Sequence, residues 1–351
     1  MEPNLLGRSV EAVLESMPTL SMLTLLAFAL LSLEQHVTAS LTEGRGAKLR
    51  AWWCWALVLG PLFFYQSFQH LWLCDDAYIS FRYAAQFARG EGLVFNPGEW
   101  VEGYTNFLWT LLLGLLAKLS LPIPSTALLG NALAAITALF TVAWTERRLG
   151  AQLPLLALAL CGSFPFLSFS SSGLETMPAI ALTLLGLAAA LRGHAGWSGI
   201  AMVGAGLCRP DHLIFWGSMG LTLAALSFSP RAGWRGLFSW MKIFRFAAPF
   251  LFIYLPYFLV RWRAYGDLFP NTYYAKSGGS SYWSQGGIYL WSFLVGSGGW
   301  LWLTALLPLG FLRLSQRGHQ ASSRSEINRT QGSAASTLKL YCAIAIPLFS
   351  L

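Results

Sequence analysis

The sequence predicts an all-α fold, a polytopic transmembrane helical bundle whose extracytoplasmic loops carry the functional site. Hydrophobic residues make up 55% of the 351 residues, and the mean hydropathy is +0.53. Charged residues make up only 11%, whereas a soluble domain contains about 25%. A larger core cannot explain this deficit, because a soluble protein must still wet its surface. We therefore expect a multi-pass protein of the plasma (inner) membrane, with the lipid bilayer as its main partner.

Apolar runs long enough to cross a bilayer recur along the chain. We expect spans near 51–73, 125–144, 151–170, 176–192, 246–260, 287–312 and 338–351. Two shorter runs, at 196–208 and 212–228, flank Arg209-Pro210-Asp211. A run at 18–33 is marginal and either spans the membrane or lies in its interface. Because the run at 338–351 reaches the last residue, we expect the sequence to be truncated there.

The placement of Lys and Arg predicts the orientation of these spans. Arg45, Lys48 and Arg50 precede the span at 51–73, so that span starts in the cytoplasm and Asp75 emerges outside. If the run at 105–121 also crossed, Arg147-Arg148 and the basic cluster at 231–245 would lie outside, against the positive-inside rule. We therefore expect 105–121 to form a re-entrant or interfacial helix.

This orientation defines the expected domain organisation. The segments are an N-terminal region with a marginal helix (1–50), a transmembrane module (51–312), a polar cytoplasmic loop (313–337) and the start of a further span (338–351). Polar segments then gather on the outer face, namely 74–104, 171–176, 209–211 and 261–286. Any chemistry is expected on that face.

Nucleic-acid binding is not expected, although the net charge is +8. Lys and Arg fall mostly in short loops between apolar runs, and no basic stripe with interleaved aromatic residues is present. The five cysteines show neither CxxC nor metal-ligand spacing, so we interpret them as small hydrophobic residues.

Two adjacent carboxylates, Asp75-Asp76, begin the first outer loop. In one interpretation, one of them simply caps a helix at 77–89 that ends at Gly90. In the other, one caps the helix while its neighbour acts as a general base, because burial and a like-charged neighbour both raise the pKa of a carboxylate. Arg82 and Arg89 share one face of this helix, where they could meet a phosphate or lipid headgroups.

Two glutamates follow at the ends of hydrophobic segments. Pro97-Gly98 fits the centre of a type II turn, and Glu102 then approaches the expected re-entrant helix. Glu102 is either a solvated interfacial residue or part of a site. Glu175 lies in a tight turn between two spans, where it either caps the next helix or serves as an active-site carboxylate.

Two further polar segments interrupt the apolar pattern. Arg209 and Asp211 either form a structural clasp, or Arg209 binds an anionic headgroup or phosphate through two parallel hydrogen bonds. At 270–276, Asn271 and Tyr274 offer donors and acceptors suited to sugar hydroxyls, and Lys276 offers a positive charge. The alternative for this segment is an ordinary polar loop.

Taken in order, these strings resemble one family. They are Asp-Asp-Ala-Tyr-Ile-Ser-Phe-Arg-Tyr (75–83), Gly-Leu-Val-Phe-Asn-Pro-Gly-Glu (92–99), Val-Glu-Gly-Tyr-Thr (101–105), Ser-Gly-Leu-Glu-Thr (172–176), Arg-Pro-Asp (209–211) and Pro-Asn-Thr-Tyr-Tyr-Ala-Lys (270–276). The sequence resembles the polyprenyl-phosphate-dependent glycosyltransferases of the GT-C superfamily, nearest to the membrane arabinofuranosyltransferases of cell-wall arabinan synthesis. The resemblance covers about residues 70–280.

The resemblance implies a GT-C-like transmembrane bundle and a catalytic base in the first outer loop, at Asp75 or Asp76. It also implies a second acidic position at Glu175. The residues then expected to bind substrate are Arg82, Glu102, Tyr104, Arg209, Asp211, Asn271, Tyr274 and Lys276.

The implied reaction is an inverting transfer of a sugar from a polyprenyl-phosphate-linked donor to an extracytoplasmic glycan or glycolipid acceptor. Some enzymes of this superfamily use a divalent metal. Paired carboxylates could hold one, but no His or third clustered acid accompanies them, so metal dependence stays open. Members of the superfamily usually have more spans, and often a soluble domain, beyond the point where this sequence stops, which leaves acceptor specificity open.

Two other classes of protein fit a polytopic sequence, a transporter and a non-catalytic assembly protein. Transporters tend to place polar, broken segments near the bilayer midplane in two related halves. Here the acidic residues lie at the outer ends of spans, and no second half mirrors the first. This pattern favours the enzyme.

Overall fold

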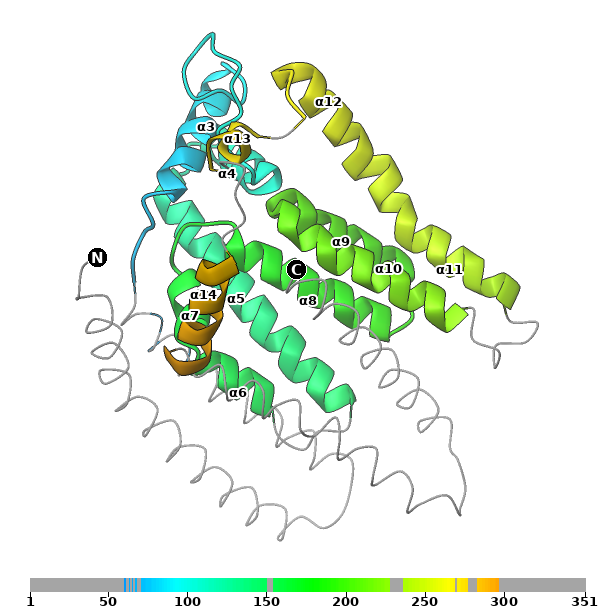
Figure 1. Ribbon diagram of the computed structural model, residues 1–351. Coiled ribbons are helices and arrows are strands. Elements are labelled where there is room, and N and C mark those ends of the chain that lie inside the picture. Colours follow the sequence, from blue (N-terminus) through cyan, green and yellow to red (C-terminus); the bar gives the residue numbers. More distant parts are fainter. Residues whose placement is uncertain are drawn as a thin grey trace, which may run out of the picture. The chain divides into compact units, whose positions relative to one another are not determined.

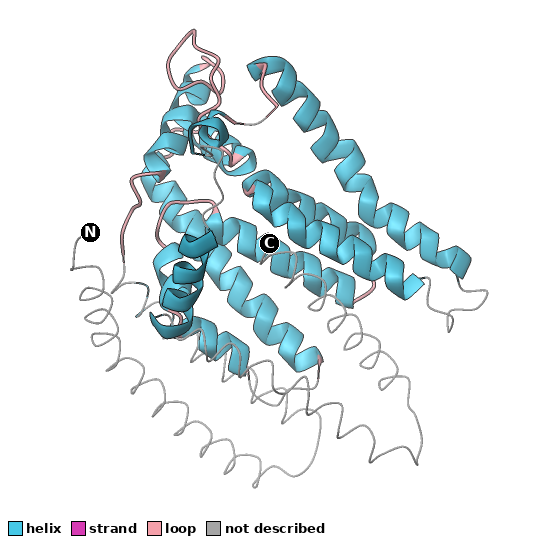
Figure 2. Ribbon diagram, in the orientation of Figure 1, coloured by secondary structure: helices cyan, strands magenta, loops and turns pink. Residues whose placement is uncertain are grey.

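The computed structural model describes residues 60, 63, 65, 67, 71–149, 154–227, 236–268, 270–276 and 283–296. All regular elements in these residues are helices (Figures 1 and 2), as the all-α prediction required. The chain divides into two compact units. One contains residues 1–70, 152–167 and 281–322, and the other contains 71–151, 168–280 and 323–351.

The second unit holds most of the described helices. They are α3 (Ala77–Arg89), α4 (Phe107–Lys118), α5 (Ile123–Arg148), α8 (Thr176–Leu191), α9 (Ala195–Cys208), η1 (Pro210–His212), α10 (Leu213–Ser227), α11 (Gly236–Pro249), the π-helical η3 (Phe250–Tyr254), α12 (Leu255–Tyr265) and α13 (Asn271–Lys276). The first unit contains α6 (Leu155–Cys161) and α14 (Trp283–Gly296), and α7 (Phe164–Phe169) crosses the boundary between the units.

Two helical stretches of the described residues are long and apolar enough to cross a membrane. They are α5 and the stretch Trp240–Tyr265, each 26 residues long, or about 39 Å at 1.5 Å per residue. Together with the low content of charged residues, these two helices support the prediction that the chain is a membrane protein. The number of crossings and their orientation stay predictions.

Helix α4 lies within the segment at 105–121, which the distribution of Lys and Arg predicted not to cross the membrane. It has 12 residues and is therefore about 18 Å long, too short to cross a hydrocarbon core of about 30 Å. This length is compatible with the expected re-entrant or interfacial helix.

One expected span is wrong as a continuous helix. The run at 151–170 contains the two short helices α6 and α7, which are separated at Gly162-Ser163. Pro165 follows the break, and a proline lacks the N–H donor that a continuous helix would need to bond back to the preceding turn. Apolar composition alone did not reveal this interruption.

Other expected spans differ in length or lie beyond the described residues. The run at 246–260 belongs to a longer helical stretch that extends to Tyr265, with π-helical geometry directly after Pro249. The end of the expected span at 51–73 is not helical at residues 71–73. Several predicted segments lie outside the described residues. They are 18–33, 313–337 and 338–351, most of 51–70, and the part of 287–312 beyond Gly296.

Small residues allow α8, α9 and α11 to pack closely. Helix α8 contacts both α5 and α9, and α9 contacts α11 (Figure 1). A Cβ atom placed on Gly199 would lie 2.2 Å from the carbonyl oxygen of Phe246 in α11. Only glycine therefore permits this approach of two helix backbones.

The first outer loop begins with the helix that the sequence predicted. Helix α3 covers Ala77–Arg89 and ends at Gly90, which adopts the left-handed conformation at φ 93°. The predicted turn is also present, because the Glu99 N–H donates to the Asn96 carbonyl at 3.1 Å and Gly98 has φ 85°.

Candidate active site

A pocket of about 690 Å³ lies within the second unit, where the first loop meets the beginnings of α4 and α8 and the break between α9 and α10. Its lining residues are Asp76, Ile79, Ser80, Gly103, Tyr104, Thr105, Asn106, Leu174, Glu175, Arg209, Pro210, Pro270 and Thr272. All of these residues except Asn106 come from five of the six strings that carried the family resemblance, and the string at 92–99 contributes none. The fold therefore brings together parts of the sequence that are up to 196 positions apart, from Asp76 to Thr272.

The structure distinguishes the two adjacent carboxylates. Asp76 lines the pocket and Asp75 does not, although both are exposed. Asp76 occupies the N-cap position of α3, but its side chain makes no capping hydrogen bond. The capping interpretation is thus not supported for Asp76, which instead lines the pocket.

Glu175 is buried, with 8% of its surface exposed. It stands at the N-cap position of α8 without a side-chain capping bond, so the capping interpretation is not supported here either. Instead, the Asn106 amide donates to Glu175 Oε2 at 2.7 Å, and Arg209 Nη1 lies 3.5 Å from Oε1. Each oxygen of this carboxylate therefore has its own partner.

Asn106 is the centre of a buried hydrogen-bond network. Its Nδ2 also donates to Ser80 Oγ at 2.8 Å, and its Oδ1 accepts a hydrogen bond from Thr110 Oγ1 at 2.8 Å. The network joins α3, α4 and the turn before α8, and it fixes the orientation of Glu175. Nearby, Trp109 donates its indole N–H to the Gly173 carbonyl at 3.0 Å, which ties α4 to the same turn.

Arg209 combines the two roles that the sequence left open. It clasps Asp211, with Nη2 donating to Oδ2 at 3.0 Å, and Nη1 donates to Thr176 Oγ1 at 3.1 Å. It also lines the pocket, with 34% of its side chain exposed. Partial burial alone would raise the pKa of Asp211, but the hydrogen bonds and charge of Arg209 outweigh burial and hold that pKa below its usual value.

Glu102 is buried rather than solvated, with 4% of its surface exposed. Arg261 Nε donates to both carboxylate oxygens, at 2.9 and 2.8 Å. Burial raises the pKa of Glu102, and the hydrogen bonds and charge of Arg261 limit that rise. The interpretation as a solvated interfacial residue is therefore wrong. Glu102 does not line the pocket, and its carboxylate is engaged by Arg261, so it positions the loop.

Backbone and aromatic contacts hold the loop beside the pocket. The carbonyl of Glu102 accepts the Asn271 N–H at 3.0 Å, which joins the loop to the start of α13. The hydroxyls of Tyr104 and Tyr265 lie 3.3 Å apart, and Tyr265 donates to the Leu93 carbonyl at 2.7 Å. Burial raises the pKa of Tyr104, so its hydroxyl stays protonated at the pocket wall.

Several predicted site residues do not line the pocket. Arg82 instead donates to the Phe95 carbonyl at 3.0 Å, within its own loop. Asn271 and Tyr274 are exposed and outside the lining, whereas their neighbours Pro270 and Thr272 belong to it. The segment expected as a loop contains the short helix α13. The side chain of Lys276 lies outside the described part of the chain.

Sequence reasoning missed Asn106 and Arg261. Each is a polar residue within or at the end of an apolar run, which is a signal of function or of a buried partner. That signal could have singled them out, although it could not have named their partners. Among the described residues, no group of three or more His, Cys, Asp or Glu side chains could hold a metal ion.

Comparison with known proteins gives two similar sequences. A terminal β-(1→2)-arabinofuranosyltransferase of Mycobacterium tuberculosis is 28% identical over 295 residues, which cover 76% of this chain and 44% of the relative. The enzyme of the same name from Corynebacterium glutamicum is 26% identical over 326 residues, covering 82% and 45%. The chain thus spans less than half the length of these relatives. No protein-family model and no solved structure matches it.

These similarities extend over most of the chain. They confirm the resemblance to arabinofuranosyltransferases that the sequence strings predicted: the chain is similar to the terminal β-(1→2)-arabinofuranosyltransferases of two bacteria.

Proposed function

We propose that this protein is a membrane glycosyltransferase that moves an arabinofuranosyl group from a polyprenyl-phosphate donor to a glycan or glycolipid acceptor outside the cytoplasm. One observation carries the proposal: Asp76, Glu175 and Arg209 line a single pocket. Its segments belong to a chain that is similar to arabinofuranosyltransferases. The pocket size of about 690 Å³ suits a sugar and part of its acceptor.

Asp76 is the proposed general base. Its carboxylate takes the proton of an acceptor hydroxyl while the hydroxyl oxygen attacks the anomeric carbon of the donor. The bond between that carbon and the phosphate oxygen breaks, and the polyprenyl phosphate leaves with the electron pair. A single displacement inverts the configuration at the anomeric carbon. Asp75, which does not line the pocket, has no role in this step.

Arg209 is the proposed partner of the leaving phosphate. A guanidinium at the pocket wall can donate two parallel hydrogen bonds to a phosphate and stabilise the charge that develops on it. Glu175, held by Asn106 on one side, fixes Arg209 on the other. We therefore assign Glu175 a positioning role in addition to any contact with the sugar.

The two neighbouring aspartates provide a matched test. Asp76→Asn and Asp75→Asn each remove one negative charge without changing side-chain size. Purified protein, reconstituted in vesicles, is assayed with a radiolabelled polyprenyl-phosphoarabinofuranose and an arabinan oligosaccharide. We expect Asp76→Asn to lose transfer by about 100- to 10,000-fold, the usual contribution of a general base, and Asp75→Asn to stay within a few-fold of the wild type.

Each other outcome has a definite meaning. If both variants transfer arabinose normally, the assigned base is wrong. A loss confined to Asp75→Asn would exchange the roles of the two residues. If the wild type transports a solute across the vesicles without any transfer, the protein is a transporter. If it does neither but binds the glycan, it is an assembly protein.

A further inference from the structure

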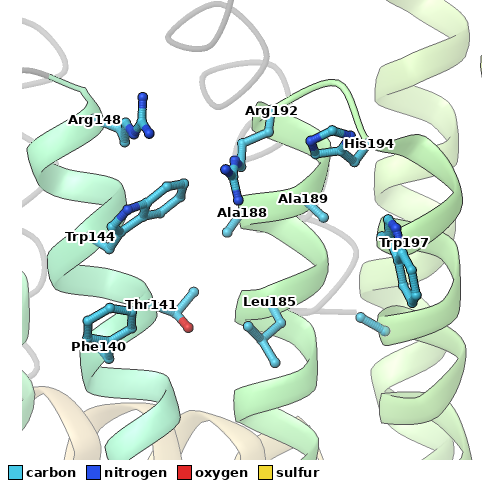
Figure 3. Close-up of a pocket in the computed structure, with 11 residues that line it drawn as sticks. Phe140, Thr141, Trp144, Arg148, Leu185, Ala188, Ala189, Arg192, His194 and Trp197 are labelled. Atoms are coloured by element: carbon cyan, nitrogen blue, oxygen red, sulfur yellow. The ribbon is translucent and has the colours of Figure 1, made fainter.

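A second pocket lies at the opposite ends of α8 and α9 from the candidate active site. It has a volume of about 550 Å³ and lies between α5, α8 and α9 (Figure 3). The active-site residue Glu175 precedes α8, whereas Arg192 follows its last residue. Since α8 has 16 residues, its two ends lie about 24 Å apart. This separation approaches the thickness of a bilayer core.

Two arginines and an aromatic platform form one side of this pocket. The guanidinium of Arg148, in the last turn of α5, lies 5.0 Å from the centre of the Trp144 ring, and that of Arg192 lies 4.6 Å from the same ring. The ring thus holds two cations close together. In the described part of the chain, neither arginine forms an ion pair, and no acidic side chain lines the pocket.

The start of α9 adds to this positive potential. His194 occupies its N-cap position, and the first free backbone N–H groups of a helix favour an anion. His194 and Trp197 both line the pocket. Two features, the paired guanidinium groups and the helix start, therefore favour one anionic group.

The remaining wall is apolar and open. Phe140 is 59% exposed, Leu185 39% and Trp197 69%. In Figure 3, Phe140 lies below Arg148 and Leu185 lies below Arg192, so the charged and apolar parts of the pocket are separated. A ligand with a charged end and a hydrocarbon tail matches both parts, whereas a free anion matches only the first.

We propose that this pocket binds an anionic phospholipid, with its phosphate between Arg148 and Arg192 and an acyl chain along Phe140 and Leu185. Basic pockets between transmembrane helices bind such headgroups at the cytoplasmic interface. In the orientation proposed above, this is the cytoplasmic face, which is opposite the catalytic pocket. The lipid would hold the ends of α5 and α8 together without taking part in the transfer.

Native mass spectrometry of the full chain in detergent tests this proposal. Delipidated protein is titrated with dioleoylphosphatidylglycerol or with dioleoylphosphatidylcholine. We expect one phosphatidylglycerol molecule to bind at least about tenfold more tightly than phosphatidylcholine. The Arg148→Gln/Arg192→Gln variant should lose that preference, because it removes both positive charges that attract the anionic headgroup. Arg89→Gln, a change at an exposed arginine outside both pockets, is the matched control and should keep the preference.

A second variant tests the pocket without removing any charged residue. Ala189→Leu fills part of the pocket wall without altering charge, and it should also weaken phosphatidylglycerol binding. Equal binding of the two lipids by the wild type, or an equal loss in Arg89→Gln, would overturn the proposal. Displacement of the lipid by millimolar inorganic phosphate would show that the pocket takes a free anion instead. Because binding is measured without sugar transfer, failure here is distinct from failure of the proposed activity.

Discussion

Arg261 donates two hydrogen bonds to the carboxylate of Glu102, although 159 residues separate them in the sequence. Arg261 lies in α12 and Glu102 lies in the loop before α4. Arg261 Nη1 also donates to the Leu268 carbonyl at 2.8 Å. The pair therefore fixes the first loop, which contributes Gly103 and Tyr104 to the candidate active site, to the end of a membrane-capable helical stretch.

Breaking this ion pair should destabilise the protein strongly. In Arg261→Met, the Glu102 carboxylate stays buried without its partner, and such a loss typically costs about 3–5 kcal/mol. We expect a lower midpoint of thermal unfolding in detergent for Arg261→Met and for Glu102→Ala. The double variant Glu102→Gln/Arg261→Met should recover part of the loss, because no buried charge remains.

The control for this experiment is Glu99→Gln, at an exposed residue of the same loop. Its unfolding midpoint should stay close to that of the wild type. If Arg261→Met unfolded no earlier than Glu99→Gln, the buried pair would contribute nothing to the position of the loop.

Asn106 should affect catalysis through Glu175 rather than through contact with the reacting atoms. Asn106→Leu removes the 2.7 Å hydrogen bond to Glu175 Oε2 and leaves that buried oxygen without its donor, a loss of about 1–3 kcal/mol. We expect a fall in kcat of about tenfold or more with a smaller change in KM. Thr110→Val, which loses only a hydrogen bond to Asn106 Oδ1, should have a smaller effect.

A simpler structural role for Asn106 predicts a different result. If Asn106→Leu lowered only the unfolding midpoint and left kcat unchanged in the folded fraction, Asn106 would stabilise the fold and not position Glu175. Partial rescue of kcat by Asn106→Gln, which keeps a donor, would support the positioning role.

The helix at 77–89, its end at Gly90 and the turn at Pro97-Gly98 were predictable, because each depends on neighbouring residues only. Capping, left-handed glycine and turn preferences act over a few positions. The same locality made Asp75 and Asp76 equivalent in the sequence. Only Asp76 lines the pocket. This difference depends on how the start of α3 is oriented against α4 and the turn before α8, which neighbouring residues do not determine.

Long-range pairing explains the remaining differences. Nothing in the sequence around Glu102 indicates that its partner is Arg261, since the pairing depends on how α12 lies beside the loop. Likewise, Arg82 was expected to meet a phosphate, but its own loop folds back and supplies the Phe95 carbonyl. The break at Gly162-Ser163 was missed because hydropathy does not register the loss of a backbone donor at Pro165.

The clasp between Arg209 and Asp211 should make stability depend on pH. The pKa of Asp211 is lowered below 3.8 in the folded protein, so the unfolded chain binds a proton more readily. The stabilisation is therefore complete above about pH 5 and is lost as the pH falls through the lowered pKa. Because Asp211 is 45% exposed, the contribution is limited to about 0.2–1 kcal/mol.

Thermal unfolding of wild type and Asp211→Asn between pH 7 and pH 3 measures this contribution. The difference between their midpoints should be largest at neutral pH and should shrink toward pH 3. A difference that does not change with pH would mean that the charge of Asp211 is not responsible for it.

Gly199 should tolerate no side chain, because α9 and α11 approach each other there. The added Cβ of Gly199→Ala would lie 2.2 Å from the Phe246 carbonyl oxygen, so the two helices must separate. We expect a destabilisation of about 1–3 kcal/mol, the usual cost of overpacking. Gly217→Ala in α10 is the matched control, since a Cβ there meets nothing within 4 Å, and alanine favours a helix over glycine by about 1 kcal/mol.

The two alanine variants should therefore shift the midpoint of thermal unfolding in opposite directions, with Gly199→Ala lower and Gly217→Ala equal or higher. Separation of α9 from α11 would also move Arg209, which directly follows α9 and lines the candidate active site. Gly199→Ala should accordingly raise KM for the polyprenyl-phosphate donor even at temperatures where it is folded. An unfolding midpoint for Gly199→Ala equal to that of Gly217→Ala would contradict the close contact between the helices.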